Sequence, residues 1–271
     1  MEESSSYLLG THADELERLR FQNQLWQPTA QAAWTRVGLQ PGQRVLDVGA
    51  GPGFAAQDLA RRVGADGRVL GLERSAVYVE AGRHLADRMA LPQLELRPFD
   101  LLRDPWPEET FDLGWCRWVA MFLSDLEPLL NGMERCLRSG GRWLIHEYVH
   151  WDTFALHPHG RAIHRFGQAC QRSFREIGGD PDVNRRLPRL LNGRGWTIEH
   201  LKPLPVLGGP DSMAAQWMER FVTVYGHTLI HLGLWTTDDA KEARNEIAQS
   251  RQEPGCFWVG PTLLEVCARH R

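Results

Sequence analysis

The stretch from Arg44 to Phe54 constrains this chain more than any other part of it. Its first residues, Val45 to Val48, are apolar apart from one aspartate, which is typical of a strand buried on both faces of a parallel sheet. Three glycines at alternate positions follow, and glycine permits a sharp turn and a close approach of a ligand to the backbone. A helix is predicted next, over Ala55 to Val63. Strand, glycine turn and helix together predict a cradle for a nucleotide-like ligand at the carboxyl edge of a sheet.

From this strand onward, predicted strands and helices alternate. This order indicates an α/β fold, a mostly parallel sheet with helices on both faces. Further strands are predicted over 68–73, 94–99, 111–119, 142–149, 196–202 and 257–267. Helices are predicted over 14–34, divided by Pro28, and over 76–89, 125–137, 161–177, 184–192, interrupted by Pro188, 212–232 and 238–252.

The chain is predicted to divide into three parts. Residues 1–40 form an amino-terminal helical segment, residues 41–150 the ligand-binding core, and residues 151–271 complete the sheet. Within the last part, 151–194 and 205–252 read as helical insertions that form a lid over the ligand edge. The apolar helix over 212–232 and its continuation to 235 would suit a homodimer.

Composition excludes several classes of protein. The net charge of -3 gives no basic surface for nucleic acid. No apolar run reaches the length of roughly 20 residues that a membrane span requires. Five widely separated cysteines and an acidic, polar amino terminus favour a cytoplasmic protein with reduced thiols. Eleven tryptophans are many for 271 residues, and some could line an apolar or aromatic substrate pocket; those outside the expected sheet are at 26, 34, 151, 217, 235 and 258.

Details of the glycine turn distinguish among nucleotide ligands. A dinucleotide fingerprint that starts at Gly49 would end at Phe54, where glycine or alanine is required. No Lys-Ser or Lys-Thr pair follows the glycines, so the turn is not a phosphate loop. Asp47 places a carboxylate inside the apolar strand, and a buried acid needs donors from the turn or from a ligand ammonium.

Acidic residues also follow the next two strands. Glu73 ends the second predicted strand, where a carboxylate can accept both hydroxyls of a ribose. Asp100 lies where the third strand would end, and its carboxylate could hold the amine of adenine. Asp112 and the segment Trp115-Cys116-Arg117-Trp118 belong to the fourth strand, which reaches the same edge.

The combination resembles the class I S-adenosylmethionine (SAM)-dependent methyltransferases, in particular the quinone-biosynthesis-like methyltransferase-domain group. The matching stretches are Val45–Gly53, Glu73, Asp100, Phe111-Asp112 and Leu137–Arg142, and they cover about residues 40 to 150 in the order of the family. The resemblance implies a Rossmann-like seven-stranded sheet whose last strand is antiparallel. It also implies SAM as cofactor and S-adenosylhomocysteine as product.

The resemblance further implies which residues bind SAM. The glycines would face its methionine part, Glu73 its ribose, and Asp100 with Leu101 its adenine. Cys116 and Arg117 would line the floor of the site. The amino-terminal helix would close over the cofactor, with Tyr7, Arg20 and Gln24 as further contacts. The complete set expected to bind the cofactor is Asp47, Gly49, Gly51, Gly53, Phe54, Glu73, Arg74, Asp100, Leu101, Cys116, Arg117, Tyr7 and Gln24.

His146-Glu147-Tyr148-Val149-His150 matches the zinc-protease pattern H-E-x-x-H, which requires a helix. Here the segment follows a Gly-Gly turn and reads as a strand, so its histidines and Tyr148 share one face and Glu147 takes the other. A zinc protease is therefore excluded and no metal is predicted. An auxiliary metal held by His146 and His150 stays open as an alternative.

The same segment is expected to border the acceptor pocket, because the fifth strand ends beside the reactive sulfonium. His146, His150 and Tyr148 are the candidate catalytic residues, since a neutral imidazole can remove a proton from a hydroxyl or an amine. His227 and His231, four residues apart on one helix, are the second choice.

The function predicted from the sequence is methyl transfer from SAM to an oxygen, nitrogen or carbon atom of a small apolar or aromatic molecule. Two alternatives keep the cofactor. One is a SAM-binding enzyme that catalyses a rearrangement or cyclisation without methylation, and the other is a binding module that senses SAM. The sequence does not identify the acceptor.

Overall fold

The computed structural model describes residues 13–271 and contains a sheet of seven strands in the order β3-β2-β1-β4-β5-β10-β7. The first five are mutually parallel, and β10 is antiparallel to both of its neighbours. The central strand β1 places Leu46 between Leu70 of β2 and Gly114 of β4. The strands of this sheet are β1 (Arg44–Val48), β2 (Arg68–Glu73), β3 (Leu94–Pro98), β4 (Phe111–Arg117), β5 (Leu137–His150), β7 (Thr197–Leu204) and β10 (Thr262–Arg269).

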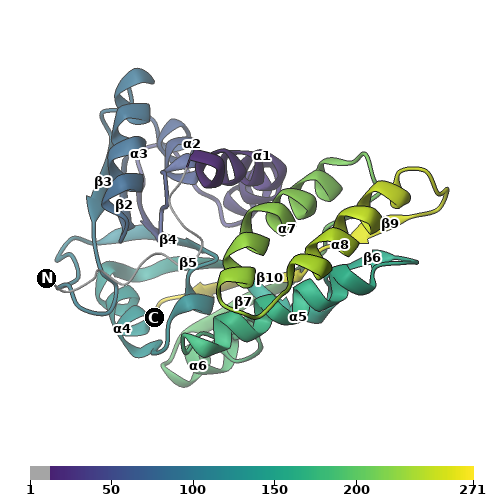
Figure 1. The fold of residues 1–271 in the computed structure, drawn as a ribbon. Coiled ribbons are helices and arrows are strands. Elements are labelled where there is room, and N and C mark those ends of the chain that lie inside the picture. The colour runs from purple at the N-terminus through teal and green to yellow at the C-terminus, as the bar shows by residue number, and fades with distance from the viewer. Residues whose placement is uncertain (1–12) are drawn as a thin grey trace, which may run out of the picture.

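Helices cover both faces of the sheet, as predicted (Figure 1). One cluster of buried side chains joins α1, α2 and α3 to one face, and a second joins α4 and α6 to the other. Both faces of each central strand are thus removed from water, which accounts for the nearly continuous apolar runs. The helices are α1 (Ala13–Arg36), α2 (Phe54–Val63), α3 (Ala76–Arg88), α4 (Glu127–Cys136), α5 (Arg161–Glu176), α6 (Leu187–Gly193), α7 (Met213–His231) and α8 (Thr237–Ser250).

The helix interruption predicted at Pro28 is wrong, whereas the segment predicted over 184–192 is divided at Arg186, between a 3₁₀ helix over Val183–Arg185 and α6. Helix α1 continues through Pro28, whose exposed ring lies on the outer side of the helix. Residues on either side, Trp26 and Ala30, are buried, so packing of this face outweighs the single lost hydrogen bond. Pro188 occupies the first turn of α6, where its missing N–H has no intrahelical partner to lose.

The carboxyl-terminal strand predicted over 257–267 is two strands. Gly260 and Pro261 separate β9 (Phe257–Val259) from β10, because proline cannot donate to a strand ladder. Strand β9 lies between β6 (Ala155–His157) and β8 (Leu207–Gly208) in a small antiparallel sheet that the sequence analysis did not predict.

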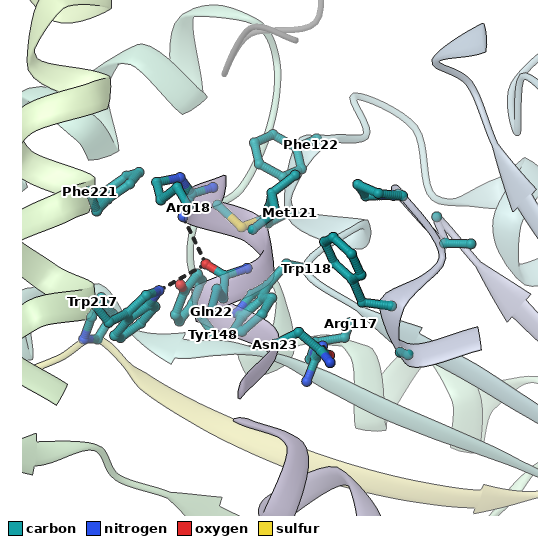
Figure 2. A pocket seen from close by; sticks show the side chains of 18 of the residues that line it. Arg18, Gln22, Asn23, Arg117, Trp118, Met121, Phe122, Tyr148, Trp217 and Phe221 are labelled. Carbon is teal, nitrogen blue, oxygen red and sulfur yellow. Dashed lines mark hydrogen bonds between the residues drawn. The ribbon is translucent and has the colours of Figure 1, made fainter. Parts of the chain in front are cut away.

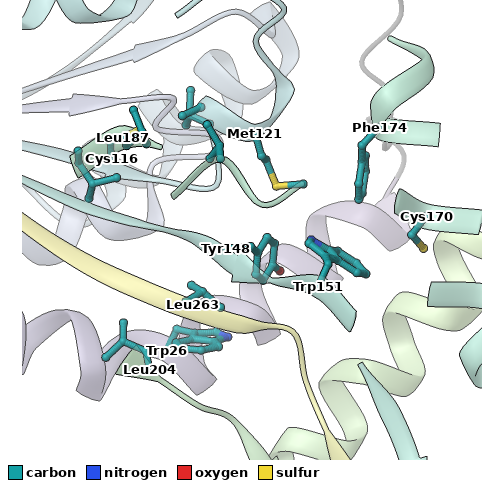
Figure 3. Packing of buried hydrophobic residues seen from close by; sticks show 14 of the residues in the cluster. Trp26, Cys116, Met121, Tyr148, Trp151, Cys170, Phe174, Leu187, Leu204 and Leu263 are labelled. Atoms are coloured by element: carbon teal, nitrogen blue, oxygen red, sulfur yellow. The ribbon is translucent and has the colours of Figure 1, made fainter. Parts of the chain in front are cut away.

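The insertions extend the core beyond the carboxyl ends of β4 and β5. Helices α5, α7 and α8 pack on one another, and α7 also packs on α1 (Figure 1). Figure 3 shows Tyr148 and Trp151, at the end of β5, close to Met121 and to Phe174 of α5. One apolar cluster therefore runs from the sheet into the insertion helices and fixes them to the carboxyl ends of β4 and β5.

Candidate functional site

The glycine turn between β1 and α2 needs glycine at each of its three positions. Gly49, Gly51 and Gly53 have φ angles of +68°, +55° and +76°, a region that favours glycine. A Cβ on Gly49 would lie 2.2 Å from Cγ2 of Val119, and one on Gly53 would lie 2.9 Å from Cδ1 of Leu96. A Cβ on Gly51 would meet none of the described residues within 4 Å, so they leave the space beside this glycine open.

A pocket opens beside Gly51 and encloses about 1020 Å³, counting the part open to solvent. Figure 2 shows α1 on one side of it, the end of β4 on another, and α7 across from them. The lining residues are Arg18, Leu19, Gln22, Asn23, Asp47, Gly49, Ala50, Gly51, Pro52, Phe54, Ala55, Trp115, Arg117, Trp118, Met121, Phe122, Tyr148, Trp151, Phe154, Phe174, Trp217, Met218, Phe221 and Pro261.

Two buried charged groups with unused hydrogen-bonding atoms line the pocket near the glycine turn. Oδ2 of Asp47 has no partner among residues 13–271, and burial raises the pKa of this carboxyl to about 7 against the opposing charge of Arg117. Arg117 donates to Oδ1 of Asn23 at 2.9 Å, while its Nη1 has no partner in the same part of the chain. Burial lowers the pKa of Arg117 to about 10. Buried polar atoms normally have partners, so these two are suited to a ligand that carries both an ammonium and a carboxylate.

Glu73 lies directly behind the glycine turn. Its carboxylate accepts the N–H of Gly51 at 2.9 Å and the N–H of Ser75 at 2.7 Å, and burial raises its pKa. Asp100 accepts the N–H of Leu102 at 2.9 Å and is partly buried. These two acids do not line the pocket, and neither do three other residues predicted to bind the cofactor, Arg74, Leu101 and Gly53.

The prediction that Cys116 lines the cofactor floor is wrong. Its side chain is fully buried and its Sγ lies 3.9 Å from Oε1 of Glu147. Side chains alternate along a strand, so Trp115 and Arg117 face the pocket and Cys116 faces the opposite side of the sheet.

The structure brings only one of the three predicted catalytic residues, Tyr148, to the pocket. His146 is fully buried, and its Nε2 lies 2.9 Å from Oε2 of Glu265. Its ring also contacts Trp115 at 4.7 Å. His150 is exposed, with Nδ1 3.2 Å from Nη2 of Arg185. Of these three residues of β5, Tyr148 alone has its side chain in the pocket lining. The predicted role of His146 and His150 as a base is therefore not supported.

The structure supports neither the second pair of candidate histidines nor the alternative of an auxiliary metal. His227 and His231 point to solvent from α7. The H-E-x-x-H segment lies in β5, which confirms that it is a strand. Within residues 13–271, no group of three or more histidine, cysteine, aspartate or glutamate side chains could hold a metal ion.

Helix α1 lines the pocket with residues other than those predicted. Gln24 is exposed, and Arg20 is exposed with its guanidinium 5.5 Å from the ring of Phe54. Tyr7 lies outside the described residues. The inward face instead presents Arg18, Leu19, Gln22 and Asn23, a set at helical spacing that a search for the buried face of the helix could have found.

An aromatic wall faces the glycine turn across the pocket. Of the six tryptophans singled out in the sequence, only Trp151 and Trp217 belong to it. Gln22 accepts from Nη1 of Arg18 and from Nε1 of Trp217, both at 2.9 Å, and so joins α1 to α7 (Figure 2). Trp118, from the segment expected at this edge of the sheet, also belongs to the wall, and the aromatic residues not predicted from the sequence are Phe122, Phe154, Phe174 and Phe221.

Comparison with known proteins identifies the family. The model of the family described as "Methyltransferase domain" matches residues 39–184, slightly more than half of the chain. The chain belongs to this family. The predicted resemblance to SAM-dependent methyltransferases, with SAM as cofactor and a Rossmann-like α/β fold, is thereby confirmed.

Curated relatives match the core of this chain. Sterol 24-C-methyltransferase of Yarrowia lipolytica is 30% identical over 120 residues, which cover 44% of this chain and 31% of that protein. Ubiquinone/menaquinone biosynthesis C-methyltransferase UbiE of Teredinibacter turnerae is 32% identical over 112 residues, or 41% of this chain and 45% of that protein. The chain thus spans less than half the length of these relatives.

Solved structures are similar over a larger part of this chain. Geranyl diphosphate C-methyltransferase of Streptomyces coelicolor A3(2), solved with Mg²⁺, geranyl diphosphate and S-adenosylhomocysteine, has a TM-score of 0.58 at 18% identity. The match covers 97% of this chain and 87% of that one. The [4+2]-cyclase SpnF has a TM-score of 0.55 at 18% identity and is covered to 80%, by 90% of this chain. At 18% identity, the structural similarity shows a shared fold.

In residues 13–271 no helix is both long and apolar enough to cross a membrane.

Proposed function

We propose that this protein transfers the methyl group of SAM to a small apolar or aromatic molecule. The observation that carries the proposal is the pair of unpartnered buried atoms, Oδ2 of Asp47 and Nη1 of Arg117, beside the open space at Gly51. The amino-acid end of SAM carries an ammonium and a carboxylate, which would complete the hydrogen bonding of this pair.

The residues around the turn would hold the rest of the cofactor. Glu73 is placed to accept from the ribose once its bond to Gly51 is exchanged, and Asp100 with Leu101 would hold adenine. Phe54 and the α1 residues Gln22 and Asn23 would cover the bound cofactor. We further propose that residues 1–40, 41–150 and 151–271 act as cover, cofactor site and acceptor lid.

When bound, SAM supplies a methyl group on a positively charged sulfur. The chain's own contribution is alignment and exclusion of water, because no imidazole in the described residues lines the pocket. Burial raises the pKa of Tyr148 far above its usual range, so its phenol stays protonated and can donate a hydrogen bond. The lack of a side-chain base favours an acceptor whose reacting atom is already nucleophilic and need not first give a proton to the protein.

Calorimetry with SAM and S-adenosylhomocysteine tests the cofactor assignment. We expect both to bind, and Glu73→Ala to weaken binding at least about tenfold, which corresponds to about 1.4 kcal/mol. Glu95→Ala is the matched control, because Glu95 on the neighbouring strand is paired with Arg68 and Arg97 away from the pocket. Absence of binding by the wild type at millimolar ligand would refute the proposal, and unaltered affinity in Glu73→Ala would remove Glu73 from the ribose role.

A second candidate is a cyclisation or rearrangement with SAM bound but not consumed. It is supported by the shared fold with a [4+2]-cyclase and by the lack of an imidazole base among the described residues of the pocket. Labelled SAM incubated with metabolite fractions separates the two, because methylation yields labelled products heavier by one CH₂ and cyclisation yields unlabelled isomers. A module that only senses SAM fits less well, because the pocket has a large aromatic half beyond the cofactor residues.

A further inference from the structure

The turn that follows β4 has an unusual backbone conformation. Trp118 has a φ angle of +56°, in the left-handed region that bulky residues rarely adopt. Its N–H donates to the carbonyl of His146 at 3.1 Å, and a short 3₁₀ helix over Ala120–Phe122 follows. A conformation of this kind persists only where its surroundings hold it in place.

Glu147, on the neighbouring strand β5, makes the contacts that hold this turn. Its Oε1 accepts the N–H of Val119 at 2.5 Å and the N–H of Ala120 at 2.8 Å. The side chain is fully buried, and Oε2 has no partner in the described residues. A carboxylate from the neighbouring strand thus caps the first turn of the 3₁₀ helix directly after Trp118.

The held turn forms a wall common to both halves of the pocket. Trp118, Met121 and Phe122 all line it (Figure 2). The indole of Trp118 stacks on Trp217 of α7 at 6.3 Å and lies 4.8 Å from the guanidinium of Arg117. The next residue, Val119, occupies the space that a side chain at Gly49 would need. A shift of this turn would therefore move the glycine turn, Arg117 and the lid contact together.

We propose that Glu147 is a positioning residue that fixes the wall over Trp118–Phe122 and thereby aligns the cofactor half of the pocket with the acceptor half. The proposal rests on the proposed function for the identity of the two ligands. Glu147 does not line the pocket, and it acts only through the backbone of the turn.

The test compares Glu147→Gln and Glu147→Ala with the wild type by two measurements. One is the Kd for S-adenosylhomocysteine by calorimetry. The other is the part of the near-ultraviolet circular dichroism that the wild type loses in Trp118→Phe, which separates the stack of Trp118 on Trp217 from the signal of the other nine tryptophans. Glu246→Ala is the matched control, because Glu246 caps the first turn of α5 through Ala162 and Ile163 and does not line the pocket.

We expect the Kd to rise about threefold in Glu147→Gln, whose amide oxygen accepts more weakly than a carboxylate, and at least about tenfold in Glu147→Ala. The tryptophan signal should fall in the same order, while Glu246→Ala loses thermal stability and leaves both measurements unchanged. If Glu147→Ala does not fold, the Kd and the tryptophan signal of Glu147→Gln decide the outcome. Values within twofold of the wild type in both readouts would overturn the proposal. Failure of the wild type to bind S-adenosylhomocysteine would instead refute the proposed function, and the dichroism would still judge Glu147.

Discussion

Asp47 shows how burial changes the chemistry of a single residue. In an apolar strand its carboxyl has a pKa of about 7, mainly because desolvation penalises the charged form. It can therefore change charge near neutral pH, unlike an exposed aspartate. The sequence predicted a buried acid here, but the extent of the shift depends on Arg117 and Glu73, which reach it from two other strands.

The raised pKa of Asp47 predicts a pH dependence of cofactor affinity. Between pH 6 and 7.5 the carboxyl becomes ionised, and only its charged form pairs with an ammonium. The affinity for SAM should rise at least about fivefold over this range in the wild type and stay nearly constant in Asp47→Asn. Calorimetry at both pH values measures this. The same rise in both proteins would show that another group is responsible.

At the scale of elements, the glycines of the β1–α2 turn have two different roles. Gly49 and Gly53 allow close packing against Val119 and Leu96, whereas Gly51 leaves room for a ligand. Gly51 and Gly38 both have a positive φ, and a Cβ added at either would meet nothing within 4 Å, but only Gly51 lines the pocket. The two positions form a matched pair for testing the cofactor site.

Gly51→Ala and Gly38→Ala should each lower the free energy of unfolding by about 1–2 kcal/mol, the cost of a left-handed alanine. Only Gly51→Ala should weaken S-adenosylhomocysteine binding, by at least about tenfold, because its methyl group enters the cofactor space. Urea denaturation and calorimetry measure the two effects. Equal binding by both variants would place the cofactor elsewhere.

At the scale of the whole molecule, a buried charge network ties α1 to three strands. Glu265 of β10 accepts from Nη1 of Arg36 at 2.5 Å, from His146 at 2.9 Å and from His200 at 2.7 Å. Burial alone would raise the pKa of Glu265, but these partners lower it to about 2. Burial also lowers the pKa of His146. His146 therefore has a structural role in place of the predicted catalytic one.

This network predicts a loss of stability in acid. The pKa of His146 is lower in the folded than in the unfolded chain, so its contribution is complete above about pH 6.5 and declines as the pH falls below that value. The slope is at most about 1.4 kcal/mol per pH unit for one proton. His146→Gln should remove this part of the decline, whereas His84→Gln, on an exposed ring, should retain it. Urea denaturation from pH 7.5 to 5 measures the difference, and parallel curves for all three proteins would contradict the prediction. A further decline should follow between about pH 4.5 and 2, where Glu265 is still charged in the folded chain but becomes protonated in the unfolded chain.

The sequence by itself determined the parallel core, the glycine turn, Asp47 and the family, because these depend on local periodicity and on residues within one strand–turn–helix unit. The tertiary structure decided which side chains meet. It placed Arg18, Gln22 and Trp217 together from helices far apart in the chain, and it turned His146 into the core. It also kept α1 straight through Pro28 and divided the last strand at Pro261. A pocket wall built from several separate elements leaves no pattern at short spacing, since its members become neighbours only when the chain has packed.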